Sequence, residues 1–203
     1  MLQKLKMLGL LLVVIGVSII VGFRVKLYTD GQKQEAIKTN FRNLCKAYQE
    51  KYIGDDGSAY IGNMEEFVPL TGDTIAIITI PEIGIDVSVV EGIEKEDIKL
   101  NIGHFPQTDM PWVKGGNFAV AGHSSIVYNC LFNDLHEAEE GMKISIQTQY
   151  GTYNYKITQM KVVEASDVSV LDRPTDGSTI CTLTTCINSG KQRLIVVGTL
   201  ENK

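Results

Sequence analysis

The sequence predicts a mainly β domain that follows an N-terminal helical region. From about residue 72, short runs rich in β-branched and aromatic residues alternate with turns, and long helical patterns are scarce. Before that point, an uncharged apolar run is followed by a segment with helical spacing. Many short strands with few long helices are typical of an antiparallel barrel or a sandwich.

The uncharged apolar run extends from Met7 to Phe23. It is close to the lower limit for crossing a bilayer, which needs roughly 17–25 residues. A cleaved secretory signal would need a small-residue cleavage site of the Ala-x-Ala kind, and the sequence has none after the run. We therefore expect an uncleaved transmembrane signal-anchor over residues 7–23. A buried core helix is a poor alternative because no polar face interrupts the run.

Positive charges flank this run on both sides. Lys4 and Lys6 precede it, and Arg24 and Lys26 follow it. The N-terminal amine together with the two lysines favours a cytoplasmic N-terminus over residues 1–6. The sequence thus predicts a single-pass protein of the cell membrane whose folded domain is extracellular.

A second helix, amphipathic, is predicted over residues 31–52. Its apolar positions recur at steps of three and four, namely Ile37, Phe41, Leu44, Tyr48 and Tyr52. We expect a stalk or a helix packed on the main domain, and a partner-binding role has no support in the sequence. Gly-Asp-Asp-Gly-Ser at residues 54–58 marks a flexible break. Residues 24–71 are therefore assigned to an extracellular stalk with an accessory helix, and residues 72–203 to the main domain.

The strand candidates of the main domain begin with Thr74–Ile80, which Pro81 interrupts. Alternation resumes at residues 85–90. Short helical pieces are expected near residues 95–100 and 129–137. Further strands are predicted at residues 117–122, 142–149, 152–163, 179–185 and 193–200.

Composition limits the function classes. The formal net charge is −5, so no basic surplus exists to neutralise phosphates, and no nucleic-acid partner is predicted. The four cysteines, at positions 45, 130, 181 and 186, match no disulfide framework and lack the paired spacing of a zinc site. Cys45 and Cys181 fall inside helical and strand patterns, so we expect small buried hydrophobes. The sequence does not decide the role of Cys130, and it predicts neither a metal nor a cofactor.

Three residues with reactive or charged side chains lie at the ends of predicted strands. Cys186 ends the run 179–186, His123 follows the run 117–122, and Arg193 opens the next strand. Each alone has a plain alternative: a core cysteine, a satisfied structural histidine or a surface arginine. Together they are the parts that a cysteine acyl-transfer site requires, and we predict such a site. A thiol becomes a nucleophilic thiolate beside an imidazolium, and a guanidinium fork binds a carbonyl or an oxyanion.

The choice of arginine follows by elimination. The chain has four arginines, Arg24, Arg42, Arg173 and Arg193. The first lies at the membrane, the second on the accessory helix and the third in a polar loop. Arg193 is therefore favoured, with Arg173 second.

Four segments resemble, in the correct order, those of the sortases, cysteine transpeptidases of mainly Gram-positive bacteria. Residues 182–186 (Thr-Leu-Thr-Thr-Cys) are similar to the family's T-L-x-T-C motif. The strand that begins at Arg193 resembles the arginine strand, and residues 115–123 resemble the histidine strand. Ile-Pro-Glu-Ile-Gly-Ile at residues 80–85 is similar to the early I-P-x-I-x-I segment. The resemblance runs from about residue 72 to the end.

This resemblance implies an eight-stranded sortase-type β-barrel and a role for each site residue. Cys186 would attack a C-terminal sorting motif such as Leu-Pro-x-Thr-Gly and form a thioester. His123 would protonate the leaving amine and then help to deprotonate the incoming one. Arg193 would hold the substrate and the oxyanion, and Thr185 would contact the substrate. The implied partners are surface proteins with a C-terminal sorting signal, an amine acceptor of the cell-wall precursor, and the lipid bilayer.

The subclass follows from smaller features. No aromatic lid of the Asp-Pro-Phe or Asp-Pro-Trp kind precedes the barrel, which argues against class C. The segment between the strand near residue 163 and the cysteine strand is short, which disfavours class B, although the helix at 31–52 resembles that class. Class D is preferred and class B is retained. No ligand spacing locates a calcium site like that of some class A members. His104 and His136 are expected to be structural or to form the rim of the site.

Two other functions remain open. A cysteine peptidase or other hydrolase would use the same three residues with water as the acceptor. A membrane-tethered binding module would have no catalytic activity at all.

Overall fold

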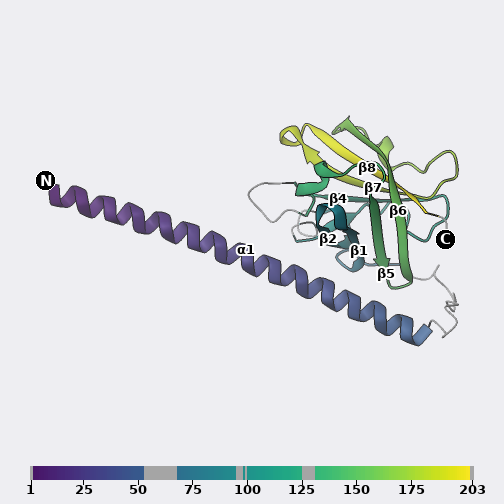
Figure 1. Ribbon diagram of the computed structural model, residues 1–203, viewed down its shortest axis with the longest axis horizontal. Coiled ribbons are helices and arrows are strands. Elements are labelled where there is room, and N and C mark those ends of the chain that lie inside the picture. The colour runs from purple at the N-terminus through teal and green to yellow at the C-terminus, as the bar shows by residue number, and fades with distance from the viewer. Residues whose placement is uncertain (1, 53–67, 95–97, 99, 125–130, 202–203) are drawn as a thin grey trace.

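One long helix and a closed β-barrel make up the described part of the chain (Figure 1). The computed structural model describes residues 2–52, 68–94, 98, 100–124 and 131–201. The predicted flexible break at residues 54–58 and Cys130 lie outside these ranges. Most of the helical piece predicted near residues 95–100 does so too.

Helix α1 runs from Leu2 to Tyr52 without interruption. The membrane segment predicted at 7–23 and the amphipathic helix predicted at 31–52 are therefore two parts of one helix. The reason is local, because residues 24–30 contain neither glycine nor proline, so nothing in the sequence ends the helix between the two parts.

The N-terminal half of α1 is apolar and exposed. Nearly all of its large apolar side chains, from Met7 to Val25, protrude from the structure. This half is long and apolar enough to cross a membrane, and none of its most apolar window is buried against the protein. The alternative of a buried core helix is therefore wrong.

Eight strands close into a barrel in the order β1-β2-β3-β4-β7-β8-β6-β5, which confirms the predicted eight-stranded barrel. Strands β2 and β3 pair in parallel, as do β4 and β7, and the other neighbours are antiparallel. The strands are β1 (Thr74–Ile80), β2 (Ile85–Glu91), β3 (Ile102–His104), β4 (Asn117–Gly122), β5 (Lys143–Thr148), β6 (Gly151–Glu164), β7 (Ile180–Ile187) and β8 (Gln192–Leu200).

Strand β3 is the one that the sequence does not predict. It has three residues, which are too few to show alternation, and its central residue is Gly103. A Cβ atom at this position would lie 2.2 Å from the carbonyl oxygen of Gly92, so only glycine allows the two backbones to approach this closely. The short strand joins β2 to β4 and so closes this part of the barrel wall.

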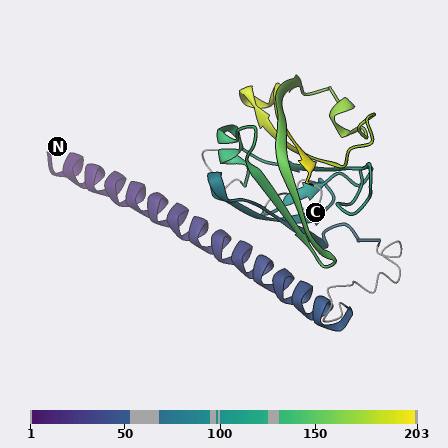
Figure 2. The same ribbon diagram turned by 45° about the vertical axis from the view of Figure 1, so that its right-hand side comes forward.

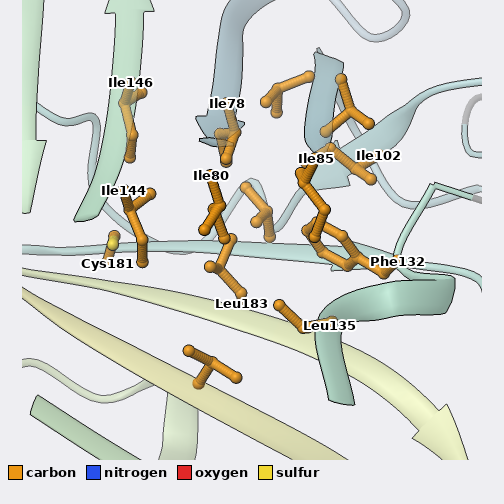
Figure 3. Packing of buried hydrophobic residues seen from close by; sticks show 14 of the residues in the cluster. Ile78, Ile80, Ile85, Ile102, Phe132, Leu135, Ile144, Ile146, Cys181 and Leu183 are labelled. Carbon is orange, nitrogen blue, oxygen red and sulfur yellow. The ribbon is translucent and has the colours of Figure 1, made fainter. Parts of the chain in front are cut away.

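The barrel interior is filled by branched aliphatic side chains that alternate along the strands (Figure 3). Ile78 and Ile80 of β1 lie beside Ile146 and Ile144 of the neighbouring strand β5, and Leu183 of β7 packs beneath them. The short helix η4 (Asn133–Glu137) lies in the region where a helix was predicted. Buried aromatic and aliphatic side chains at η4 cover one end of this core, namely Phe132 and Leu135.

Candidate functional site

The strand register brings three predicted site residues to one end of the barrel. Strand β4 lies parallel to β7 with Gly122 opposite Thr185, so the next residue of the chain, His123, is level with Cys186. Strand β8 is antiparallel to β7, and Arg193 lies directly opposite Cys186. The thiol, the imidazole and the guanidinium therefore come from three adjacent strands.

These three residues line one pocket of about 290 Å³. Asp167 and Arg193 contribute charged side chains to the pocket, and Cys186 is among its lining residues. The remaining walls are mostly apolar and are formed chiefly by Ile93, Ile98, Phe105, Val168, Val170 and Leu171. A chamber of this kind suits a peptide that presents an apolar side chain beside the thiol.

Cys186 is the only described cysteine that is not fully buried. Burial raises the pKa of the Cys45 thiol to about 11 and that of the Cys181 thiol to about 12. Both stay protonated and inaccessible at neutral pH, as expected of small buried hydrophobes. Among the cysteines in the described ranges, Cys186 is thus the one available as a nucleophile.

Two hydrogen bonds tie the ends of β4 and β7 together around this site. The hydroxyl of Ser124 donates to the backbone carbonyl of Cys186. The hydroxyl of Thr185 donates to the carbonyl of Gly122 at 2.8 Å. Thr185 lines the pocket, but its hydroxyl proton is used within the barrel wall, so this hydroxyl could contact a substrate only as an acceptor. Ser124 was not predicted as a site residue, although its position directly after His123 was a usable signal.

The neighbouring Thr184 differs from Thr185 in that its hydroxyl has no hydrogen-bond partner among the described residues. Its side chain is 7% exposed and lines the pocket, and its hydroxyl oxygen is buried. Thr184 precedes Cys186 by two positions, so both side chains lie on the outer face of β7. That spacing could have identified Thr184 from the sequence.

Arg193 is oriented by the turn between β7 and β8. Its Nη1 donates to the carbonyl of Gly190 at 2.8 Å and to that of Gln192 at 3.1 Å. The turn is η6 (Asn188–Gly190), in which Asn188 and Ser189 have positive φ values of 49° and 55°. Both bonds use Nη1, which leaves the donors on Nη2 and Nε for a ligand.

Arg173, the second choice for this role, is engaged elsewhere. It forms a two-pronged ion pair with Asp109, with Nε–Oδ2 at 2.9 Å and Nη2–Oδ1 at 2.5 Å. Burial alone would raise the pKa of Asp109, but hydrogen bonds from Arg173 and from the Asn117 backbone outweigh it and lower that pKa. Arg173 does not line the pocket, so Arg193 is the arginine that the structure brings to the site.

Asn117 fixes the pocket wall that connects β6 to β7. Its Nδ2 donates to the carbonyls of Val170 and Asp172 at 3.1 Å and 3.0 Å. Its Oδ1 accepts a hydrogen bond from Thr182 at 2.8 Å. The Asn117 side chain is fully buried, so these bonds hold the wall residues Val168–Leu171 against the barrel. Asn117 could not be predicted from the sequence, because its partners are far away in the chain.

The other two histidines lie outside the pocket. His104 is buried, with its Nδ1 2.8 Å from Oε2 of Glu91 and its Nε2 3.1 Å from Oγ1 of Thr108. Its ring stacks on Phe118 with 4.9 Å between centroids. His136 bonds to the backbone of its own turn. Both are structural, as expected.

No group of three or more potential metal-ligating side chains comes together anywhere in the described ranges.

Comparison with known proteins agrees with this geometry. Residues 78–201 match the family model of the sortase domain. Sortase D of Bacillus subtilis is 26% identical over 178 residues, which cover 85% of this chain and 87% of the relative. The solved structure of a Clostridium perfringens Sortase D5 transpeptidase has a TM-score of 0.65 and 31% identity, covering 85% of this chain and 98% of the other.

A further similar structure is Sortase E1 from Streptomyces coelicolor with a tripeptide in the active site. It has a TM-score of 0.59 and 32% identity, over 64% of this chain and 90% of the other. The Bacillus and Clostridium relatives are both of class D, the class that the sequence analysis preferred. Since the matched domain covers more than half of its length, the chain belongs to the sortase family of cysteine transpeptidases, which anchor proteins to the cell wall.

Proposed function

We propose that this sortase cleaves a C-terminal sorting motif similar to Leu-Pro-x-Thr-Gly and transfers the cleaved protein to an amine of a cell-wall precursor. The observation that supports the proposal most directly is the register, which puts His123, Cys186 and Arg193 level around one pocket. The apolar walls of the pocket suit the leucine and proline side chains of such a motif.

In the first half of the reaction, the Cys186 thiol gives its proton to His123, and the sulfur attacks the carbonyl carbon between the last two residues of the motif. The peptide C–N bond breaks, and His123 gives a proton to the leaving amine. The product is a thioester between Cys186 and the new C-terminus. Arg193 stabilises the oxyanion of the tetrahedral intermediate through Nη2 and Nε, since its Nη1 is bonded to the β7–β8 turn.

In the second half, an amine attacks the thioester carbonyl and His123 accepts the proton that the amine loses. The C–S bond breaks, the sulfur of Cys186 is released and a new peptide bond forms. A thioester retains the acyl group in a reactive form until the amine arrives, whereas hydrolysis would end the reaction with a free carboxylate.

The exposed apolar half of α1 supports a membrane location for this reaction. In this proposal residues 7–23 cross the bilayer once, residues 1–6 lie in the cytoplasm and the barrel lies outside the cell. The substrates and the acceptor then meet the enzyme on the outer side of the membrane.

The test uses the full chain in detergent micelles with a Leu-Pro-x-Thr-Gly peptide library, with and without a triglycine acceptor. We expect a ligated product that depends on the acceptor, and an acyl adduct on Cys186 in the intact mass. Cys186→Ala and His123→Ala should both lose the product, while both keep the thermal unfolding of the parent chain. Cleavage with the same rate and the same products in the presence and absence of the amine acceptor would identify a hydrolase instead. Peptide binding without cleavage, equal in Cys186→Ala, would identify a binding module.

A further inference from the structure

Helix α1 is joined to the barrel by a partly buried ion-pair cluster, which we call the clamp and which consists of Lys38, Arg42 and Asp86. The ammonium of Lys38 lies 2.8 Å from Oδ2 of Asp86 and 3.0 Å from its backbone carbonyl. Nη2 of Arg42 lies 2.8 Å from Oδ1 of the same carboxylate. The Lys38 side chain is only 7% exposed, whereas those of Asp86 and Arg42 are 35% and 41% exposed. The Lys38 ammonium is therefore enclosed between α1 and the barrel, and the other two members of the clamp reach solvent.

Two further contacts continue along the same side of α1. Phe41 and Cys45 form a buried apolar cluster with Ile77 of β1. One turn further on, the ring of Tyr48 meets that of Tyr150 edge to face, with 5.4 Å between centroids. Three separate contacts along an unbroken helix define both its position and its direction on the barrel.

The order of these contacts gives the direction of α1. Along the helix they come as Lys38, Phe41 and Tyr48, while on the barrel they run from the β1–β2 turn, along β1, to the β5–β6 turn. Helix α1 is therefore antiparallel to β1. Its N-terminal half leaves the barrel at the end where β1 stops and β2 begins.

Strand pairing places the active site at that same end. The start of β2 and the end of β4 share it, because β3 is parallel to β2 and antiparallel to β4. The end of β7 and the start of β8 share it too, because β7 is parallel to β4 and antiparallel to β8. In both views the yellow turn between β7 and β8 lies on the side toward which the N-terminal half of α1 extends (Figures 1 and 2).

The distance from the apolar run to the barrel is short. One side of α1 loses exposure at positions 27, 30 and 31 and is buried from Gln34 onward. Leu27 lies four residues beyond Phe23, and Gln34 lies eleven residues beyond it. At 1.5 Å per residue these intervals are about 6 Å and about 16 Å.

We propose that the clamp holds the active-site end of the barrel toward the bilayer at a fixed, short height, so that the enzyme processes peptides tethered to the same membrane close to its surface. This inference rests on the membrane anchor in the proposed function. A tethered peptide whose spacer reaches the pocket has a high effective concentration there, and one whose spacer is too short cannot react.

The orientation of the barrel relative to the bilayer can be tested without measuring catalytic activity. The full chain with Cys186→Ala and Cys130→Ser is reconstituted in phosphatidylcholine vesicles that contain an acceptor dye on the lipid headgroups. A donor dye is attached at Ser189→Cys, in the β7–β8 turn, or at Thr175→Cys, in the exposed loop at the other end of β7. Cys45 and Cys181 are buried and stay unlabelled.

We expect several-fold stronger energy transfer from the label at position 189 than from the label at position 175. Asp86→Asn should reduce this difference, because it removes the charge that holds both cations. Equal transfer from both sites in vesicle-bound protein, or stronger transfer from position 175, would overturn the inference. Protein that fails to sediment with vesicles would instead overturn the membrane anchor.

A second test uses cleavage of tethered peptides to measure the distance of the active site from the bilayer. The wild-type chain is combined in one vesicle with a sorting peptide joined to a membrane helix by spacers of increasing length. Seven residues inserted after Tyr28 add two helical turns, about 10 Å, and keep the same face of α1 toward the barrel. The spacer length that gives the fastest cleavage should then grow by about three extended residues. An optimum that does not move would overturn the inference, while equal cleavage of a soluble peptide by both chains shows that the catalytic function is intact.

Discussion

Two adjacent threonines before Cys186 differ in whether their hydroxyls have a partner. Thr185 donates to the Gly122 carbonyl, whereas the Thr184 hydroxyl is buried without a partner among the described residues. An unsatisfied buried hydroxyl costs about 1–3 kcal/mol, and a satisfied one contributes about 1 kcal/mol. The same substitution at the two positions should therefore change stability in opposite directions.

We expect Thr184→Val to raise the free energy of unfolding by about 1 kcal/mol or more, because valine fills the same volume without a hydroxyl. Thr185→Val should lower the free energy of unfolding by about 1 kcal/mol, because the hydrogen bond to the Gly122 carbonyl is lost. It should also lower kcat, because this bond holds the end of β4 beside His123. Guanidinium unfolding of the full chain in detergent measures both changes. A loss of stability in Thr184→Val would show that its hydroxyl has a partner such as water.

For Arg193, the effect of the oriented guanidinium donors can be separated from the effect of the positive charge. Its guanidinium spans the turn carbonyl of Gly190 and the pocket, which a single ammonium cannot do. We expect Arg193→Lys to lower kcat about 100-fold, the size of the loss when one oxyanion donor is removed. The measurement is the steady-state kinetics of sorting-peptide cleavage.

The matched control is Lys191→Ala, which removes an exposed cation from the same turn and should leave kcat unchanged. If Arg193→Lys kept the wild-type kcat, Arg193 would supply only a general positive field and not a set of oriented donors.

At the scale of single elements, the wall between β6 and β7 depends on Asn117 at the start of β4. We expect Asn117→Ala to raise KM several-fold more than it changes kcat, because Val170 and Asp172 lose the donors that hold the wall. It should also lower the free energy of unfolding by about 2 kcal/mol, because the buried Thr182 hydroxyl loses its acceptor and two further hydrogen bonds are lost.

Thr182→Val separates the two effects. It removes only the hydrogen bond between Thr182 and Oδ1 of Asn117, and it leaves both donors to the wall in place. This variant should be less stable with an unchanged KM. A KM in Asn117→Ala equal to that of the parent chain would show that the wall does not contact the substrate.

The elements also show which features can be predicted from the sequence. Seven strands are predicted to within two residues at each end, because alternation and turn residues are local signals. Strand β3 is missed because three residues around Gly103 carry no periodic signal. The single helix is predicted as two parts because its composition changes from apolar to amphipathic near residue 24, although its backbone does not change.

The residues of the candidate site could be predicted from the sequence, but the way they come together could not. Cys186, His123 and Arg193 could be identified as strand-end residues, but their neighbourhood depends on the parallel pairing of β4 with β7 across about sixty residues of chain. Such non-local pairing leaves no local pattern. For the same reason the partners of Asn117 and the contrast between Thr184 and Thr185 appear only in the structure.

At the scale of the whole molecule, the ionisation of the clamp couples the position of the barrel to pH. Burial alone would raise the pKa of Asp86, but hydrogen bonds from Lys38 and Arg42 outweigh it and hold that pKa below its ordinary value of 3.8. Burial alone would lower the pKa of Lys38, but its bonds to Asp86 and Glu35 raise it above 10.5.

The directions of these two pKa shifts define the pH range in which the clamp stabilises the docking of α1. A carboxylate with a lowered folded pKa contributes stability above its unfolded pKa and loses it as the pH falls through the folded pKa. A lysine with a raised folded pKa contributes stability below its unfolded pKa and loses it as the pH rises through the folded pKa. The docking of α1 is therefore strongest between about pH 4 and pH 10.

We expect acidification below pH 3.8, the ordinary pKa of Asp86, to release α1 from the barrel before the barrel itself unfolds. The single tryptophan, Trp112, reports this step because its ring packs on Tyr150, which in turn contacts Tyr48 of α1. Its fluorescence should change more with pH in the parent chain than in Asp86→Asn, in which the carboxylate of the clamp is absent. Asp109 also has a lowered pKa, so the informative quantity is the difference between the two chains. Identical titrations of both chains would mean that the apolar and aromatic contacts hold α1 in place without the clamp.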